Sequence, residues 1–335
     1  MNKKIEFGIV GGGWRAEFFL RIAKALPEKF NVTAMMVRNP EKGRAIESAW
    51  GVKTYSSLDE FLKKSEHLFV VISTPSDVAG KIVVELAGRR IPVLMETPPC
   101  RDIDGLTALF KAVGLNAKIQ IAEQYAFQPM HASRLNLIKS GKLGRISQAQ
   151  VSVAHDYHGI NLMRRFLDIG FDDATISGFS FNSPVIAGPG RNGPPEAETV
   201  NTSIQSFARL EFDGKLGIYD FLSDQYHSWI RTPRILIRGE RGEINNNRIN
   251  YLIDFKTPVQ TEFIRQEAGR EANLEGFHLR GILAGSEWVY ENPFVPGRLS
   301  DDEVAVATCL EKMQAYVDRG IEFYSLAEAS QDTYL

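Results

Sequence analysis

The chain has 335 residues, of which 24% are charged and 44% are hydrophobic. These fractions are ordinary for a globular protein and exclude collagen-like, coiled-coil and disordered chains. A net charge of −2 gives no electrostatic attraction to nucleic acid, and no apolar run approaches the ~20 residues of a membrane helix. The two cysteines, Cys100 and Cys309, lack the spacing of zinc ligands. We therefore expect no metal site and no nucleic-acid or membrane partner. Since no secretory signal pattern is found, we expect a cytoplasmic location.

Short apolar segments alternate with amphipathic segments over the first third of the chain. Strand-like segments occupy residues 4–10, 31–37, 68–72, 91–95 and 118–122, and helical periodicity occurs at 15–26, 41–50, 58–64, 77–88 and 103–114. Strands that are apolar throughout and are joined by helices are typical of a parallel sheet covered on both faces. The sequence therefore predicts an α/β domain with a doubly wound parallel sheet at the N-terminus.

The pattern changes near residue 125. A helix is predicted over 130–139, longer strands over 146–154, 199–212, 215–221 and 234–238, a loop over 184–195, and a long amphipathic helix over 301–319. Partial alternation in these strands predicts a C-terminal α+β domain with a large open, mostly antiparallel sheet. We expect residues 1–125 to form the first domain and 126–335 the second, with the last helices returning towards the first domain.

Residues 8–16 read GIVGGGWRA, in which Gly11, Gly13 and Ala16 match the pattern G-x-G-x-x-G/A. The pattern lies between the first strand and the first helix, where it is typical of Rossmann domains. Glycine at 11 permits a tight turn, glycine at 13 lets a pyrophosphate approach the backbone, and a small residue at 16 allows close helix packing. The free N–H groups at the start of the helix would face the phosphates. The sequence therefore predicts binding of NAD or NADP.

The end of the second strand discriminates between these two dinucleotides. An acidic residue there binds the ribose 2′-hydroxyl of NAD, whereas an arginine accommodates the 2′-phosphate of NADP. This sequence has Val37-Arg38-Asn39-Pro40, without an acid. Arg15, in the first turn of the first helix, is a second candidate cation. The sequence thus favours NADP, with a solvated surface arginine as the alternative interpretation of Arg38.

Several short motifs together resemble the Gfo/Idh/MocA oxidoreductase family, which includes glucose–fructose oxidoreductase and inositol dehydrogenase. In chain order they are GIVGGGWRA at 8–16, STPS at 73–76, ETP at 96–98, KLGRI at 142–146, HGIN at 158–161 and FYSL at 323–326. The resemblance covers essentially the whole chain. It implies a Rossmann domain followed by an open-sheet domain that often mediates oligomerisation, so we expect a homodimer or homotetramer. It also implies hydride transfer between nicotinamide and a carbinol of a sugar or polyol substrate.

The resemblance assigns roles to residues of this chain. The family's Glu-Lys-Pro motif, whose lysine assists proton transfer, aligns with Glu96, Thr97 and Pro98, and its His-x-x-Asp pair aligns with His158 and Asn161. The catalytic candidates are His158, Asn161 and Thr97, the cofactor-binding candidates are Gly11, Gly13, Trp14, Arg15, Arg38, Thr74, Pro75 and Glu96, and the substrate-binding candidates are Tyr125, Tyr157 and His155.

Thr97 and Asn161 stand where the family has a lysine and a carboxylate, so more than one function class stays open. In the first, His158 exchanges the substrate proton near neutral pH, and the protein is an NAD(P)-dependent dehydrogenase or reductase. In the second, the protein is a catalytically silent regulator or sensor that binds the dinucleotide without turnover. Glycosidase-like chemistry with an internal hydride transfer is a third and less favoured class.

The second domain also predicts self-association. A one-layer sheet with helices on one side leaves its other face to be covered, and pairing with a second copy is a common solution. From the alternation over residues 199–221 we expect five apolar side chains on that outer face: Ile204, Leu210, Phe212, Leu216 and Ile218.

Overall fold

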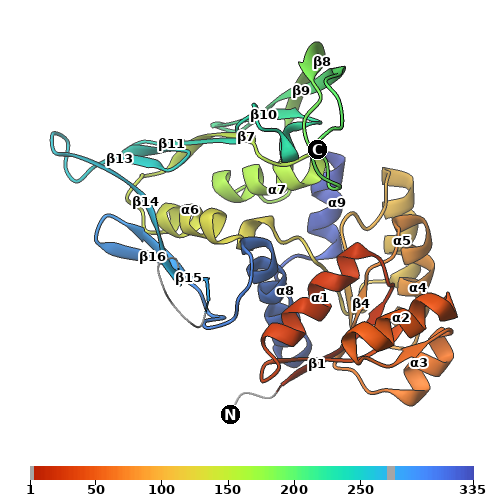
Figure 1. Cartoon of the computed structure of the whole chain (residues 1–335). Helices are drawn as coiled ribbons and strands as arrows, with labels where there is room; N and C mark the ends of the chain where they lie inside the picture. The colour runs from red at the N-terminus through yellow and green to blue at the C-terminus, as the bar shows by residue number, and fades with distance from the viewer. Residues whose placement is uncertain (1–3, 270–275) are drawn as a thin grey trace. The chain divides into compact units, whose positions relative to one another are not determined.

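The computed structural model describes residues 4–269 and 276–335 of the chain (Figure 1). The chain forms two compact units. Unit 1 comprises the described residues of Met1–Pro129, Glu267–Arg280 and Asn292–Tyr334, and unit 2 comprises Met130–Gln266, Gly281–Glu291 and Leu335. Among the described residues, no helix combines the length and the apolar character needed to cross a membrane.

Unit 1 is built on a parallel sheet with, in the described residues, six strands in the order β3-β2-β1-β4-β5-β6. The strands are β1 (Ile5–Val10), β2 (Phe30–Met36), β3 (Thr54–Tyr55), β4 (Phe69–Ile72), β5 (Val93–Met95) and β6 (Ile119–Ile121). The helices between them are α1 (Trp14–Ala25), α2 (Pro40–Trp50), α3 (Leu58–Lys64), α4 (Ser76–Gly88) and α5 (Ile103–Val113). β4 and β5 are buried along their whole length, which accounts for their uninterrupted apolar sequences. The predicted doubly wound parallel sheet is confirmed.

The strand order of this sheet defines where a ligand would bind. β1 pairs with β2 on one side and with β4 on the other, so the order reverses at β1. In open α/β sheets, ligands bind beyond the carboxyl ends of the strands at this switch point. The segment that follows β1 there is the glycine-rich turn.

Two C-terminal helices complete unit 1. α8 (Asp301–Arg319) begins with a capping box between Ser300 and Glu303, and α9 (Leu326–Tyr334) follows it. Gln120 of β6 holds the connection between them, because its Oε1 accepts the backbone N–H groups of Phe323 and Tyr324, each at 2.9 Å. Both helices are therefore tied to the parallel sheet.

Unit 2 is organised around an open sheet whose described strands follow the order β16-β15-β14-β13-β12-β11-β7-β10-β9-β8. The strands are β7 (Ile146–Ser152), β8 (Thr175–Ile186), β9 (Val200–Phe212), β10 (Lys215–Leu222), β11 (Arg234–Gly239), β12 (Gly242–Asn245), β13 (Arg248–Leu252), β14 (Pro258–Ala268), β15 (His278–Ala284) and β16 (Glu287–Glu291). β7 and β10 pair in parallel, whereas β8–β9, β9–β10, β7–β11 and the successive pairs from β11 to β14 are antiparallel. The predicted large, mostly antiparallel sheet is confirmed.

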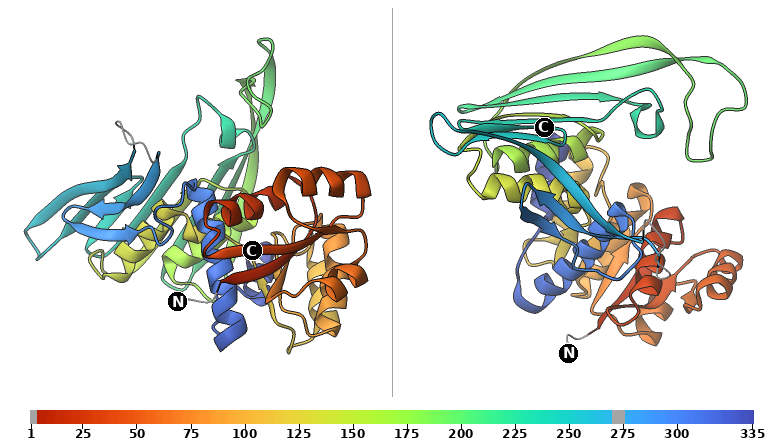
Figure 2. Two further views of the ribbon diagram at one scale, coloured as in Figure 1. Left: turned by 60° about the horizontal axis from the view of Figure 1, so that its bottom comes forward. Right: turned by 60° about the vertical axis from the view of Figure 1, so that its left-hand side comes forward.

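Helices α6 (Pro129–Lys139) and α7 (Asp156–Leu167) lie on one face of this sheet (Figure 2). A Cβ atom on Gly217 of β10 would lie 2.1 Å from Sδ of Met163 in α7, so strand and helix are in close contact there. Directly paired residues share a face of a sheet, and Leu210 is the partner of Gly217. Leu210 therefore lies on the helix-facing side, and Ile204 and Phe212 lie there with it because they are an even number of residues away.

The opposite face of this sheet, called the outer face below, carries Leu216 and Ile218. Phe179 and Phe207 lie on the same face, and their rings stack at a centroid distance of 4.9 Å. The expectation that five apolar residues share the outer face is therefore wrong for the three on β9. Apolar residues alternate correctly within β9 and within β10, but which face each set occupies depends on the register between the strands.

Candidate functional site

The glycine-rich turn brings β1, β4 and α1 together. Gly11 has a φ of +123°, and a Cβ atom there would lie 2.2 Å from the carbonyl oxygen of Ser73, which follows β4. Its N–H donates to the carbonyl oxygen of Met36 at 3.0 Å. Both the backbone conformation and the close approach require glycine at position 11. This glycine serves the fold of the turn.

Gly13 differs from Gly11 because the fold does not require it. It is the N-cap of α1 in an extended conformation (φ −78°, ψ 176°) that any residue can adopt. No described atom lies within 4 Å of the place where its Cβ would be. Open space directly over the first N–H groups of a helix is suited to a phosphate group. The turn therefore fits a dinucleotide, and Ala16, which is buried, allows α1 to pack closely.

The segment after β4 adds a polar atom to this turn. Thr74 lies beside Gly11, since its Cγ2 would be 3.4 Å from a Cβ at that position. The Thr74 hydroxyl is buried and has no hydrogen-bond partner among the described residues. A buried hydroxyl without a partner is costly, and a bound cofactor would supply the missing partner. Pro75, the N-cap of α4, follows as an exposed residue.

Arg15 is part of an internal ion-pair network. Its Nε donates to Oε1 of Glu96 at 2.9 Å, and its Nη1 lies 3.8 Å from Oδ2 of Asp302 in α8. Burial alone lowers the pKa of Arg15, but the carboxylates of Glu96 and Asp302 raise it above its usual value. The charge of Arg15 is thus used to join α1, the end of β5 and α8. The interpretation of Arg15 as a second cation for a 2′-phosphate is not supported.

Arg38 lies at the carboxyl end of β2, next to the turn. It is exposed, and in the part of the chain that the structure describes its guanidinium has neither an ion pair nor a hydrogen bond. The next residue, Asn39, caps α2 by accepting the N–H groups of Glu41 and Lys42 with its Oδ1. Arg38 therefore remains available as a cation, as the sequence predicts.

Two aromatic candidates and the strand-five motif complete the set in unit 1. Trp14, the first residue of α1, is 55% exposed and meets Phe18 edge-on at 5.8 Å. Thr97 is partly buried after β5, and its peptide bond to Pro98 is cis. Tyr125 begins a short 3₁₀ helix, and its N–H donates to Oε1 of the buried Glu123 at 3.1 Å.

The remaining candidates gather at the start of α7 in unit 2. The rings of His155 and His158 lie 4.9 Å apart, and the rings of Tyr157 and His158 lie 4.3 Å apart. His158 is buried, and the buried Asn161 lies three residues further along the helix, on the same side. The structure therefore brings all four unit 2 candidates into one cluster.

Two tyrosines that the sequence analysis did not select hold this cluster. The hydroxyl of Tyr226 lies 2.6 Å from Nδ1 of His155 and accepts the backbone N–H of the same residue at 3.0 Å. The hydroxyl of Tyr219 accepts the N–H of Asp156 at 2.8 Å, and burial raises the pKa of this tyrosine well above its usual value. Both come from the β10 region, more than 60 residues later in the chain. Of the two, only Tyr219 could have been indicated by the sequence, because the alternation of side chains along β10 turns it towards the helix.

Comparisons with known proteins identify the first of these units. Residues 5–122 match the family described as "Oxidoreductase family, NAD-binding Rossmann fold", which is Gfo/Idh/MocA. Residues 5–122 are therefore similar to the NAD-binding domain of Gfo/Idh/MocA oxidoreductases. The predicted resemblance to NAD-binding oxidoreductases of this family and the predicted fold class are therefore confirmed.

Curated relatives are distant. An L-aspartate dehydrogenase of Methanococcus maripaludis is 24% identical over 246 residues, which cover 72% of this chain and 85% of that protein. The same enzyme from a second strain is 27% identical over 161 residues, 47% of this chain and 57% of that protein. An uncharacterised oxidoreductase of Schizosaccharomyces pombe is 29% identical over 148 residues, 43% of this chain and 40% of that protein.

Solved structures share the fold over nearly the whole chain. Levoglucosan dehydrogenase in complex with NADH and levoglucosan has a TM-score of 0.67 and 16% identity, covering 99% of this chain and 95% of that one. A putative myo-inositol dehydrogenase from Sinorhizobium meliloti has a TM-score of 0.64 and 14% identity, covering 98% and 94%. At these identities the likeness concerns the fold.

Proposed function

We propose that unit 1 binds a nicotinamide dinucleotide with its pyrophosphate against Gly13 and the N-terminus of α1. The observation that carries this proposal is the open space at Gly13, where the fold needs no glycine. The buried, unpartnered hydroxyl of Thr74 beside the same turn supports it. Glu96 and Arg15 act on this site indirectly, by fixing the end of β5 against the start of α1.

We infer that the bound nicotinamide exchanges a hydride with a carbinol carbon of a sugar- or polyol-like substrate. The chain must then handle a proton, because oxidation of a carbinol releases the hydroxyl proton. A ring nitrogen of His158 accepts that proton in oxidation and returns it in reduction, since an imidazole can act both as a general base and as a general acid. The hydroxyl of Thr97 has no useful pKa near neutrality and serves only as a hydrogen-bonding group.

The surroundings of His158 support a hydroxylated substrate. The rings of His155 and Tyr157 contact the buried His158 imidazole, and Tyr226 packs against His155. Such aromatic faces pack well against sugar rings. The amide of Asn161 orients a substrate hydroxyl but, unlike a carboxylate, does not raise the basicity of His158. Levoglucosan and inositol dehydrogenases among the structural neighbours agree with this class.

Three finer predictions belong to this proposal. The preference for NADP rests on the exposed, unpaired Arg38 at the end of β2. Self-association as a homodimer or homotetramer rests on the apolar outer face of the unit 2 sheet. A cytoplasmic location rests on the free thiols of Cys100 and Cys309, which suit a reducing compartment.

A substrate panel tests the proposed activity. Purified protein is assayed for reduction of NAD and NADP with aldoses, inositols, anhydrosugars and other polyols, and for the reverse reaction with the corresponding keto compounds. L-aspartate is included because the curated relatives are L-aspartate dehydrogenases. Turnover with a carbinol substrate supports the proposal. Turnover with L-aspartate alone would replace the substrate class while retaining the cofactor site.

A further inference from the structure

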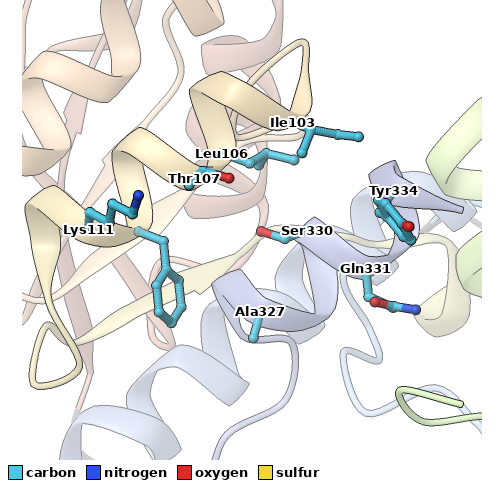
Figure 3. Close-up of a pocket in the computed structure, with 9 residues that line it drawn as sticks. Ile103, Leu106, Thr107, Lys111, Ala327, Ser330, Gln331 and Tyr334 are labelled. Carbon is cyan, nitrogen blue, oxygen red and sulfur yellow. The ribbon is translucent and has the colours of Figure 1, made fainter.

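A groove lies on the surface of unit 1 between α5 and α9, away from every residue of the proposed cofactor site, and it has a volume of about 340 Å³ (Figure 3). Lys111 lies near one end of the groove, and Ile103 and Tyr334 lie towards the other, so the two helices run antiparallel along it. The volume falls within the range of small-molecule sites. None of the residues assigned to the proposed dehydrogenase reaction lines this groove, so the reaction does not account for it.

Small side chains on α9 create the hollow. Ala327 and Ser330, three residues apart, face α5 on one side of the helix. The Ser330 hydroxyl donates to the carbonyl oxygen of Leu326 at 2.7 Å, so its hydrogen bond is satisfied within its own helix. These two short side chains leave room in the groove, and the Ser330 hydroxyl does not need a hydrogen bond from a ligand.

The opposite wall, on α5, is mostly apolar and incompletely covered. Ile103 and Phe110 are 49% and 39% exposed, and Tyr334 at the end of the α9 wall is 65% exposed. Leu106 of α5 also lines the groove and is buried. Apolar side chains that gather in a concave site and stay exposed are typical of a binding surface.

One charge is present at the groove. Lys111 is its only ionisable lining residue apart from the Tyr334 phenol, and no acidic residue lines it. Within residues 4–269 and 276–335, the Lys111 ammonium forms no ion pair, hydrogen bond or ring contact. An apolar trough with an unpaired cation at one end is complementary to an amphipathic anion.

We propose that this groove binds a small monocarboxylate with an apolar tail. The carboxylate pairs with the Lys111 ammonium, and the tail lies along Leu106, Phe110 and Ala327. The distance from Ile103 to Lys111 along α5 is eight residues, or about 12 Å, which suits a medium-chain acyl group and exceeds the length of acetate. This site is separate from the residues assigned to the dinucleotide, so its test does not depend on the dehydrogenase activity.

Octanoate is the probe for this site, and octan-1-ol is its uncharged counterpart. Binding is measured by calorimetry, and its location by amide chemical shifts of α5 and α9. We expect saturable, one-to-one binding of octanoate in the wild type. Lys111→Gln weakens octanoate binding at least fivefold and leaves octan-1-ol binding unchanged. Ser330→Leu, which fills the groove, abolishes binding of both probes.

Lys42→Gln on the exposed face of α2 is the charge-matched control and keeps octanoate affinity within twofold. Ala327→Leu replaces Ser330→Leu if that variant melts at a lower temperature. The proposal is overturned if octanoate shows no saturable binding. It is also overturned if octanoate binding is unaffected by both Lys111→Gln and the variants that fill the groove. An oligomer that Phe110→Asp dissociates overturns it as well, because a second copy of the chain would then occupy the groove.

Discussion

In the proposed cofactor site, Gly13 is the residue that the pyrophosphate approaches most closely. In Gly13→Val, the new Cβ would enter the space at the start of α1, where no described atom apart from the chain neighbours lies within 4 Å. We expect the fold and melting temperature to persist while affinity for NAD and NADP, measured by calorimetry, falls at least 100-fold. Gly88→Val at the exposed end of α4, where space is equally open, is the matched control and retains affinity. Wild-type affinity in a folded Gly13→Val variant would show that the pyrophosphate lies elsewhere.

The proposed preference for NADP over NAD rests on Arg38. A charge-assisted contact to the 2′-phosphate contributes roughly 1.5–3 kcal/mol, so Arg38→Ala should reduce NADP affinity roughly 10- to 100-fold and leave NAD affinity unchanged. Arg319→Ala, at the end of α8, removes the same charge from a distant exposed site and serves as control. Equal losses for both dinucleotides, or no loss for either, would make Arg38 a solvated surface residue.

In the proposed reaction, His158 carries the proton transfer that Thr97 cannot. General acid–base groups contribute roughly 10²–10⁴-fold in rate, and His158→Ala should lower kcat by that factor. Because the residue belongs to unit 2, the dissociation constant of the dinucleotide should stay within twofold. A full pH profile checks the assignment, since the wild-type limb that reports an imidazole should disappear in the variant. A retained limb with unchanged kcat would transfer the role to another group.

At the scale of elements, β8 is the clearest sign of a missing neighbour. Most of its residues are exposed on both faces, and Phe179 on the outer face is 66% exposed. Covering this face with a second copy would bury the stacked pair of Phe179 and Phe207. Phe179→Asp should therefore reduce the assembled mass measured by light scattering. Phe255→Asp, at the exposed turn between β13 and β14, should leave the mass unchanged. A wild-type monomer at micromolar concentration would contradict the assembly.

The connection from α3 to β4 makes stability depend on pH. His67 stacks on Phe61 at 4.4 Å, and its two ring nitrogens lie 2.5 Å from the Thr33 hydroxyl and 3.1 Å from the Ser65 hydroxyl. Burial lowers the pKa of His67 to about 4. In the unfolded chain the pKa of this histidine is near 6.5. At a pH between about 4 and 6.5, the unfolded chain therefore binds more protons than the native chain. The free energy of unfolding falls as the pH falls through this range.

Urea unfolding at pH 7.5 and pH 5 measures this dependence. The contribution of His67 to the fall in unfolding free energy is on the order of 1 kcal/mol, after allowing for the solvent around this partly exposed ring. His67→Gln should remove this contribution. A smaller total fall should remain in that variant, because burial and the neighbouring Arg134 also lower the pKa of His131. His227→Gln, at an exposed position, is the control and should retain the whole drop. An identical drop in wild type and His67→Gln would refute the argument.

At the scale of the molecule, local patterns predicted much of the fold. The glycine turn, the buried strands of the parallel sheet and the predicted strands over 199–212 and 215–221 all depend on residues close together in sequence. β8 and β12–β16 were missed. β8 has no buried face whose alternation could reveal it, because most of its residues are exposed.

Some residues of the candidate site could be predicted from local sequence patterns, and others could not. Gly11, Gly13, Arg38 and His158 could be selected from motifs, since each belongs to a short segment of fixed spacing. The ion pair between Arg15 and Glu96 joins residues 81 positions apart. Its geometry follows from the strand order of the sheet, and no local pattern predicts it. Side chains that hold a site from a distance, such as those of Tyr219 and Tyr226, escape sequence analysis for the same reason.

Single-turnover hydride transfer tests the central claim most directly. Protein in excess over NADPH labelled with deuterium at nicotinamide C4 is mixed rapidly with keto-sugars and keto-polyols, so that slow product release cannot hide the chemistry. We expect loss of the reduced-nicotinamide signal and deuterium at the new carbinol carbon of at least one product, with both abolished in His158→Ala. Tight binding of cofactor and ligand without any deuterium transfer would contradict the account and favour a regulator that binds the dinucleotide without turnover.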